Sequence, residues 1–221
     1  MSAKTQTSAA HPARITVLAG VNGSGKSTLM GAMLQKKGVS YFNPDVFTRQ
    51  LMKVDASLGL ETANSAAWNV GRMQLENAFK KKTSYNLETT LGANTIPNLL
   101  KQAAQKGLEV VVWYCGLTNP ELNLRRVAQR VAKGGHDIPE EKIRARWISS
   151  RENLIRLLPF LTEVKVFDNS AEATVQPSGG RAPSPILLLH VSGHKIVQCA
   201  PKPPAWAKPI IAAARLNAQA V

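Results

Sequence analysis

Nine consecutive residues combine glycines, hydroxyls and a lysine in a spacing suited to holding phosphate. Residues 20–28 read GVNGSGKST, which matches G-x-x-x-x-G-K-[ST] at every fixed position. The glycines allow backbone N–H groups to turn inward and form an anion-binding nest. Lys26 would reach the β- and γ-phosphates, and the Ser27 hydroxyl would be a ligand of Mg²⁺. We therefore expect a site for ATP or GTP with Mg²⁺, built from Gly20, Asn22, Gly23, Ser24, Gly25, Lys26, Ser27 and Thr28.

The segments on either side of this loop predict the elements that position it. Residues 14–19 are short, apolar and β-branched, as in a buried strand. Residues 29–34 carry apolar side chains at helix spacing, and Gly38 is expected to end that helix. A chance glycine turn between two core elements is the alternative interpretation. Strand, loop and helix nevertheless occur in the order that a phosphate-binding loop requires.

Two acidic residues are expected at the carboxyl ends of other strands, near this loop. Asp45 follows a predicted strand at 39–42 and could accept a proton from a substrate hydroxyl or hold Mg²⁺ through water. The alternative is that Asp45 only caps the next helix. Glu88 and Thr89 follow a predicted strand at 84–87 and are suited to binding sugar or ribose hydroxyls, unless they form a polar surface turn.

Four arginines flank a glycine pair later in the chain. Arg126 and Arg130 are four residues apart on a predicted helix and therefore share a face. The glycine pair at 134–135 would act as a hinge that brings Arg144 and Arg146 back toward the phosphate site. Each arginine alone is more readily interpreted as a solvated side chain. Together they predict a lid that neutralises charge on a transferring phosphate.

The fate of the phosphate depends on the other polar residues. Hydrolytic ATPases carry an apolar strand that ends in an acidic residue. The nearest match in this sequence is 164–168, and Lys165 interrupts its apolar run. The loop residue His136 could bind substrate, although a loop histidine is more often structural than a base. No signature of ABC transporters or of GTPase base recognition is present in the sequence. These features favour a phosphotransferase over a motor or a switch.

Strands and helices alternate along the chain. Helices are expected at 46–53, 61–80, 96–106, 120–133 and 140–158, and further strands at 108–114 and 164–168. This alternation predicts an α/β P-loop NTPase fold with a mostly parallel sheet and helices on both faces. Beyond residue 170, the sequence predicts a small appendage with a β-hairpin at 186–191 and 195–199 and a helix at 210–216.

Composition divides the 221 residues into three parts. Residues 1–13 are expected to be a disordered tail, 14–170 a kinase domain with its lid around 134–146, and 171–221 a basic C-terminal appendage. No apolar run is long enough to cross a membrane. The two cysteines lack metal-binding spacing, and a reduced cytoplasm is the expected location.

The net charge of +14 is the unusual bulk property. A nucleic acid, an anionic substrate or an acidic protein partner would explain it, as would a solvated basic surface. Arginines are concentrated between 125 and 156, which favours phosphate contacts, and an aromatic fraction of 5% leaves few platforms for stacking bases. A nucleotide-dependent nucleic-acid-binding ATPase stays an alternative to a kinase, and so does a nucleotide-binding interaction module without catalysis.

The motifs taken together resemble a known family. Residues 20–28, 43–45, 86–91, 126–139 and 168–170 resemble the zeta-toxin-like P-loop kinases, and more narrowly a bacterial branch often labelled predicted ABC-type ATPases. The resemblance covers about residues 14–170. It implies a fold related to nucleotide and shikimate kinases, and transfer of the γ-phosphate of ATP or GTP to a nucleotide sugar. In the best understood members the acceptor is the 3′-hydroxyl of UDP-N-acetylglucosamine.

The resemblance also implies roles for single residues. Lys26 and Ser27 would hold phosphate and Mg²⁺, Asp45 would be the catalytic base, and Glu88 with Thr89 would bind substrate.

The family uses two lid arginines. Arg130 and Arg146 are the expected pair, with Arg126 and Arg144 as close competitors because the spacing does not settle the register. The Gly-Gly-His-Asp-Ile-Pro lid is typical of the narrower branch, and the basic tail after residue 170 lies outside the shared core. Family toxins are commonly held inactive by a small antitoxin that blocks nucleotide access. The expected partners are therefore a nucleotide, a small-molecule acceptor and an antitoxin, ahead of nucleic acid.

Overall fold

The computed structural model of the chain describes residues 12–36, 38–171 and 183–219. The expected disordered tail lies almost wholly outside these residues, as does much of the stretch between residue 170 and the predicted hairpin. Within the described ranges no helix is long and apolar enough to span a membrane.

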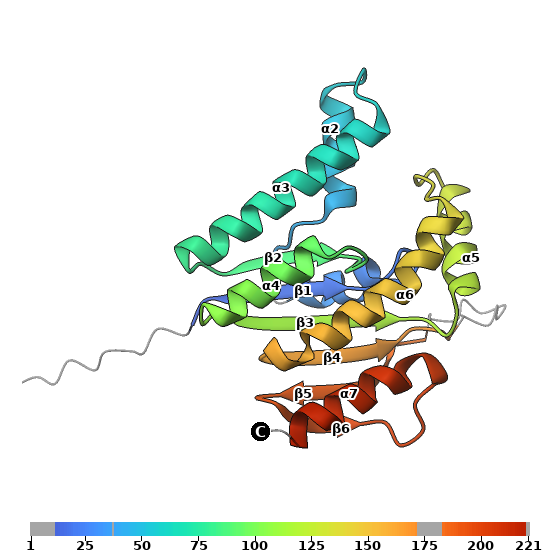
Figure 1. Cartoon of the computed structure of the whole chain (residues 1–221). Helices are drawn as coiled ribbons and strands as arrows, with labels where there is room; N and C mark the ends of the chain where they lie inside the picture. Colours follow the sequence, from blue (N-terminus) through green and yellow to red (C-terminus); the bar gives the residue numbers. More distant parts are fainter. Residues whose placement is uncertain (1–11, 37, 172–182, 220–221) are drawn as a thin grey trace, which may run out of the picture.

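The sheet is mostly parallel, as predicted. Its strands run in the order β2-β1-β3-β4-β5-β6 (Figure 1). β1 to β4 pair in parallel, and β5 and β6 are antiparallel additions at one edge. The parallel strands therefore bring their carboxyl ends to one edge of the sheet, where ligands bind in such folds. Within the part of the chain that the structure describes, the strands are β1 (Arg14–Ala19), β2 (Tyr85–Thr89), β3 (Glu109–Gly116), β4 (Glu163–Asp168), β5 (Ile186–Ser192) and β6 (Lys195–Cys199).

Helices lie on both faces of the sheet and beyond one of its edges. α4, α6 and α7 cover one face, whereas α2 and α3 form a pair beyond β2 (Figure 1). A π-helical turn at Ser27–Gly31 precedes the short α1. The α-helices of the described residues are α1 (Ala32–Lys36), α2 (Pro44–Val54), α3 (Leu60–Lys81), α4 (Thr95–Gln105), α5 (Pro120–Val131), α6 (Glu140–Leu157) and α7 (Lys208–Gln219).

Alternating strand residues fill a core on each face of the sheet. Val112 and Val166 point toward the helical layer and are fully buried together with Leu154 of α6. Leu18 points the opposite way and packs against Leu34 of α1. This alternation follows from the two-residue period of a strand. It is the reason that near-continuous apolar runs in the sequence correspond to strands covered on both sides.

The C-terminal hairpin continues the main sheet. β5 pairs with β4, and β6 pairs with β5. Trp206 and Ile210 are buried in the larger core, and the ring of Trp206 lies 6.3 Å from that of Tyr114. The hairpin and the helix were both predicted from the sequence. The described part of the C-terminal region shares its sheet and its core with the preceding residues.

The prediction of a strand at 39–42 is wrong. This segment makes a single parallel bridge to β2, in which Phe42 N donates to Asn86 O and Glu88 N donates to Phe42 O, both at 2.8 Å. Pro44 explains why pairing goes no further. It has no N–H group for a ladder, and its fixed φ suits the first turn of a helix, so that the chain enters α2 instead.

Candidate functional site

The loop after β1 is packed directly against the backbone of other elements. Gly20 and Gly23 have φ angles of +143° and +82°, which residues with a Cβ atom rarely adopt. A Cβ atom at Gly20 would lie 2.3 Å from the carbonyl oxygen of Cys115 in β3. One at Gly23 would lie 2.6 Å from the carbonyl oxygen of Asn123 in α5. Glycine is therefore required at these positions of the loop.

Three buried side chains from outside the motif also hold the loop. Asn123 Nδ2 donates to Asn22 O at 2.7 Å, and Asn169 Nδ2 donates to Ser24 O at 2.8 Å. Cys115 Sγ donates to the same carbonyl at 3.1 Å. Burial raises the pKa of this thiol to about 12, so that it stays a protonated donor. Asn169 belongs to a motif noted in the sequence, whereas nothing in the sequence distinguishes Asn123 or Cys115.

Glu88 joins this loop to β2. Its Oε1 atom accepts a hydrogen bond from Ser27 Oγ at 2.9 Å and lies 3.5 Å from Lys26 Nζ. Its Oε2 atom accepts one from Asn43 Nδ2 at 3.1 Å. The residue is only 4% exposed, and a buried carboxylate is tolerated when it is paired in this way. Glu88 therefore contacts the expected phosphate and metal ligands, and it also lines the adjoining cleft together with Thr89.

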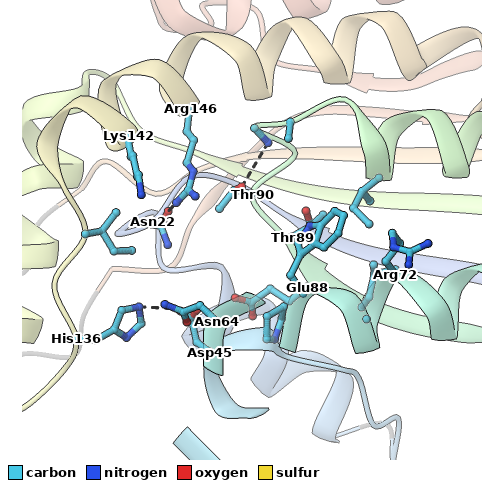
Figure 2. A pocket seen from close by; sticks show the side chains of 18 of the residues that line it. Asn22, Asp45, Asn64, Arg72, Glu88, Thr89, Thr90, His136, Lys142 and Arg146 are labelled. Atoms are coloured by element: carbon cyan, nitrogen blue, oxygen red, sulfur yellow. Dashed lines mark hydrogen bonds and ion pairs between the residues drawn. The ribbon is translucent and has the colours of Figure 1, made fainter. Parts of the chain in front are cut away.

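Asp45 lies in the first turn of α2 and faces the lid. The helix cap is Asn43, whose Oδ1 accepts the N–H of Val46 at 3.2 Å, so that Asp45 is not needed for capping. Asp45 Oδ2 lies 3.9 Å from Arg130 Nη1, and Oδ1 lies 3.9 Å from His136 Nε2. Figure 2 shows His136 and Asp45 approaching from opposite sides of the cleft.

Arg146 lines the cleft, and Arg130 contacts two of its lining residues, Asp45 and His136. Arg146 Nη1 donates to Asn22 Oδ1 at 2.9 Å, which links α6 to the phosphate loop (Figure 2). Burial lowers the pKa of Arg146, and the negative charge of Asp45 partly opposes this shift. Arg130 Nη2 donates to the carbonyl of His136 at 3.0 Å and thereby fixes the lid loop close to Asp45.

The competing arginines have other partners. Arg126 Nη2 donates to Ala171 O at 3.2 Å. Arg144 of α6 forms ion pairs of 2.7 Å with Glu121 of α5 and Glu140 of α6, and both glutamates are exposed. Among the residues that the structure describes, Arg146 is the one of the four arginines that lines the cleft, and Arg130 lies 3.9 Å from Asp45. These two positions favour Arg146 and, through its contact with Asp45, Arg130 as the lid pair.

The cleft itself encloses about 610 Å³ between the phosphate loop, α3, the end of β2 and the lid. It starts at Asn22 and Lys26 and extends past Asp45 along α3 (Figure 2). Several of its lining residues carry no recognisable motif in the sequence. These are Asn64, Trp68 and Arg72 of α3, Gly92 and Thr95 after β2, and Lys142 of the lid.

The wall after β2 is held by polar side chains of α6. Ser150 Oγ donates to Thr90 O and Asn153 Nδ2 donates to Leu91 O, each at 2.6 Å, and Ser149 Oγ donates to the carbonyl of Gly92 at 2.9 Å. Leu91 is buried and has a φ of +53°, a conformation that costs energy for a leucine. The same helix therefore carries Arg146 and shapes the cleft wall opposite α3.

Comparisons with known proteins identify relatives of this chain. The family model named Zeta toxin matches residues 1–179. A protein of Haemophilus influenzae, described as "Uncharacterized protein", is 31% identical over 133 residues, which are 58% of this chain and 88% of that protein.

Two solved structures share the fold. A crystal structure of AvrRxo1-ORF1:-ORF2 with ATP aligns with a TM-score of 0.63 at 16% identity, covering 92% of this chain but only 63% of that one. This chain thus spans less than two thirds of that protein's length. The structure of the PezAT chromosomal toxin-antitoxin system of Streptococcus pneumoniae aligns with a TM-score of 0.53 at 12% identity, covering 93% of this chain and 85% of that one. At these identities the likeness shows the fold alone.

The family match agrees with the geometry of the site. It covers the phosphate loop, Asp45, Glu88 and the lid, and it spans well over half of the chain. The expected P-loop fold is confirmed by the sheet and by the solved structures that it resembles. This chain therefore belongs to the zeta toxin family and has a P-loop fold.

Proposed function

We propose that this chain transfers the γ-phosphate of ATP or GTP to a hydroxyl of a small molecule, and that a nucleotide sugar such as UDP-N-acetylglucosamine is the acceptor. One observation carries the proposal. Asp45, Arg146 and the phosphate loop line the same 610 Å³ cleft, and Arg130 lies 3.9 Å from Asp45.

The donor side fits a nucleotide with Mg²⁺. The nest of N–H groups and Lys26 would hold the β- and γ-phosphates. Ser27 Oγ and the Glu88 carboxylate are 2.9 Å apart, and both are oxygen donors of the kind that Mg²⁺ prefers. When bound, Mg²⁺ would neutralise charge on the phosphates. Lys26 would then exchange part of its contact with Glu88 for the phosphate.

The acceptor side supplies a base. In the proposed step, Asp45 takes the proton of the acceptor hydroxyl while that oxygen forms a bond to the γ-phosphorus. The bond from this phosphorus to the β–γ bridging oxygen breaks, which leaves ADP or GDP. Arg130 and Arg146 would stabilise the negative charge on the phosphoryl group in transit. The lid residue His136 would keep the Asp45 carboxylate turned toward the cleft.

The cleft has room for an acceptor of nucleotide size. Its volume lies within the usual range for small-molecule sites, about 300–1,000 Å³. Asn64, Trp68 and Arg72 recur every four residues along one face of α3, which spaces them over roughly 12 Å. An amide, an indole and a guanidinium in a row suit a polar molecule with a ring and an anionic group. This supports a nucleotide sugar over a single small sugar.

A small antitoxin is the protein partner that we propose. The PezAT structure is of a toxin-antitoxin system, and AvrRxo1-ORF1 was crystallised with ORF2. An antitoxin that covers the cleft of this chain would control access of the nucleotide. Such a pair would act in the cytoplasm, where nucleotides and nucleotide sugars are found.

Transfer of label from [γ-³²P]ATP or [γ-³²P]GTP tests the proposed function. The full chain is incubated with Mg²⁺ and, separately, with nucleotide sugars, nucleosides and RNA. Label is expected on a nucleotide sugar and nowhere else. Label on no acceptor, together with ATP hydrolysis that RNA stimulates, would contradict the kinase and favour a nucleic-acid-dependent ATPase.

A further inference from the structure

Asn43 bridges the phosphate site and the helix that carries Asp45. Its Nδ2 group donates to Glu88 Oε2 at 3.1 Å, and the other oxygen of Glu88 accepts from Ser27 at 2.9 Å. Its Oδ1 atom accepts the N–H of Val46 at 3.2 Å and caps α2. Both ends of one short side chain are thus engaged, and Asp45 follows two residues later.

The backbone before α2 is held to β2 as well. Phe42 exchanges two hydrogen bonds of 2.8 Å with Asn86 and Glu88, which fixes the position of the chain up to Asn43. Pro44 then restricts the backbone at the first position of the helix. The packing of α2 against α3, with a hydrogen bond of 3.0 Å from Thr48 to Asn64, holds the body of the helix, and the contact between Asn43 and Glu88 holds its first turn.

We propose that Asn43 is a positioning residue for phosphotransfer. Its amide N–H tethers the start of α2 to Glu88 and so sets the Asp45 carboxylate against the phosphate loop. The proposal rests on the proposed function, in which Asp45 acts as the base. A simpler role, in which Asn43 only caps α2, would need the Oδ1 atom and not the Nδ2 group.

Two variants separate the tether from the cap. Asn43→Asp has the same shape and keeps the capping oxygen, but it replaces the donor with a second carboxylate beside Glu88. Asn43→Ser also keeps a capping oxygen and loses the amide without adding charge. We expect kcat to fall on the order of 10²-fold for Asn43→Asp and about 10-fold for Asn43→Ser, because small misplacement of a catalytic group is costly. The Kd of a fluorescent ATP analogue should stay within about threefold of the wild type, because the loop nest that binds it is intact.

The experiment measures kcat, KM for the acceptor and the Kd of the ATP analogue for wild type and both variants. A fall in kcat in both variants, larger in Asn43→Asp, at an unchanged Kd supports the tether. Wild-type kcat in both variants, or an equal loss of kcat in both, would overturn it. If the wild type labels no acceptor, the proposed function fails instead. The tether is then measured by amide hydrogen exchange in α2, where protection in Asn43→Asp equal to that of the wild type would overturn it.

Discussion

Backbone contacts help to hold the donor half of the cleft, whereas side-chain contacts hold the wall of the acceptor half. In the donor half, the glycines of the phosphate loop pack against carbonyl groups of β3 and α5, backbone against backbone, in addition to the side chains of Asn123, Asn169 and Cys115. In the acceptor half, the segment 90–92 is held by hydroxyl and amide side chains of α6. Backbone contacts admit few alternatives, whereas side-chain contacts change with single substitutions. The same fold can therefore keep one donor site while its acceptor site is altered.

The largest expected effect is from Gly20→Ala in the donor half. The new Cβ atom would lie 2.3 Å from a backbone oxygen at a φ of +143°, and neither element can move easily. We expect loss of ATP binding and a melting temperature lowered by at least several degrees, since backbone strain alone costs about 1–3 kcal/mol. Thermal unfolding followed by circular dichroism and binding of an ATP analogue measure both. A melting temperature and an ATP affinity equal to those of the wild type would contradict a rigid donor half.

Arg130→Gln tests the lid where the two halves meet, with Arg144→Gln as the matched control. Removing one charge-stabilising donor costs on the order of 10²–10³ in kcat, which is the loss expected for Arg130. Arg144 has only exposed partners, so its replacement should change stability by less than about 0.5 kcal/mol and leave kcat nearly unchanged. Steady-state phosphotransfer rates decide between them. A larger loss of kcat for Arg144→Gln than for Arg130→Gln would mean that Arg144, and not Arg130, is the lid arginine.

Asn153→Ala should damage the acceptor half alone. Asn153 is 1% exposed, and its removal leaves the Leu91 carbonyl without this donor, at a cost of about 1–3 kcal/mol. We expect KM for the acceptor to rise about tenfold while the Kd for ATP stays the same. Asn94→Ala, on an exposed neighbour in the same segment, serves as a control. An equal loss of ATP affinity in Asn153→Ala would show that the halves are not separable.

Gly92→Ala is the smallest change and the counterpart of Gly20→Ala. Its Cβ atom would meet Arg146 Cγ at 2.6 Å and Arg146 Cβ at 3.3 Å, and both are side-chain rather than backbone atoms. Arg146 can shift, so we expect only a few-fold change in acceptor KM and kcat, comparable to about 1 kcal/mol. A few-fold change in acceptor KM and kcat, with an unchanged melting temperature, would support the contrast between the donor and acceptor halves. Unfolding as severe as for Gly20→Ala would refute it.

The donor half could be predicted from the sequence because its requirements are local. A nest of N–H groups needs glycines at fixed spacing, so the motif from Gly20 to Thr28 predicts the nest directly. The expected α/β fold followed from the alternation of strands and helices. The segment 39–42 misled the prediction, since its side chains suit a strand while Pro44 ends the pairing after one bridge.

The acceptor half could be predicted only in part. Asp45, Glu88 and Thr89 lie at strand ends or helix starts where polar residues are conspicuous. Ser150 and Asn153 contact a segment about 60 residues earlier, and no local pattern signals such a contact. The choice between Arg130 and Arg126 had the same difficulty, because both lie on one helix and only its packing decides which one faces Asp45.

The most direct test of the account compares Asp45→Asn with the wild type in labelled phosphotransfer and in ATP binding. The substitution keeps the size of the side chain and leaves the phosphate loop untouched, but it removes the base. The account predicts that transfer falls by about 10²–10⁴-fold while the Kd for ATP and the melting temperature stay close to the wild type. Transfer at the wild-type rate by a folded Asp45→Asn variant would contradict the central claim.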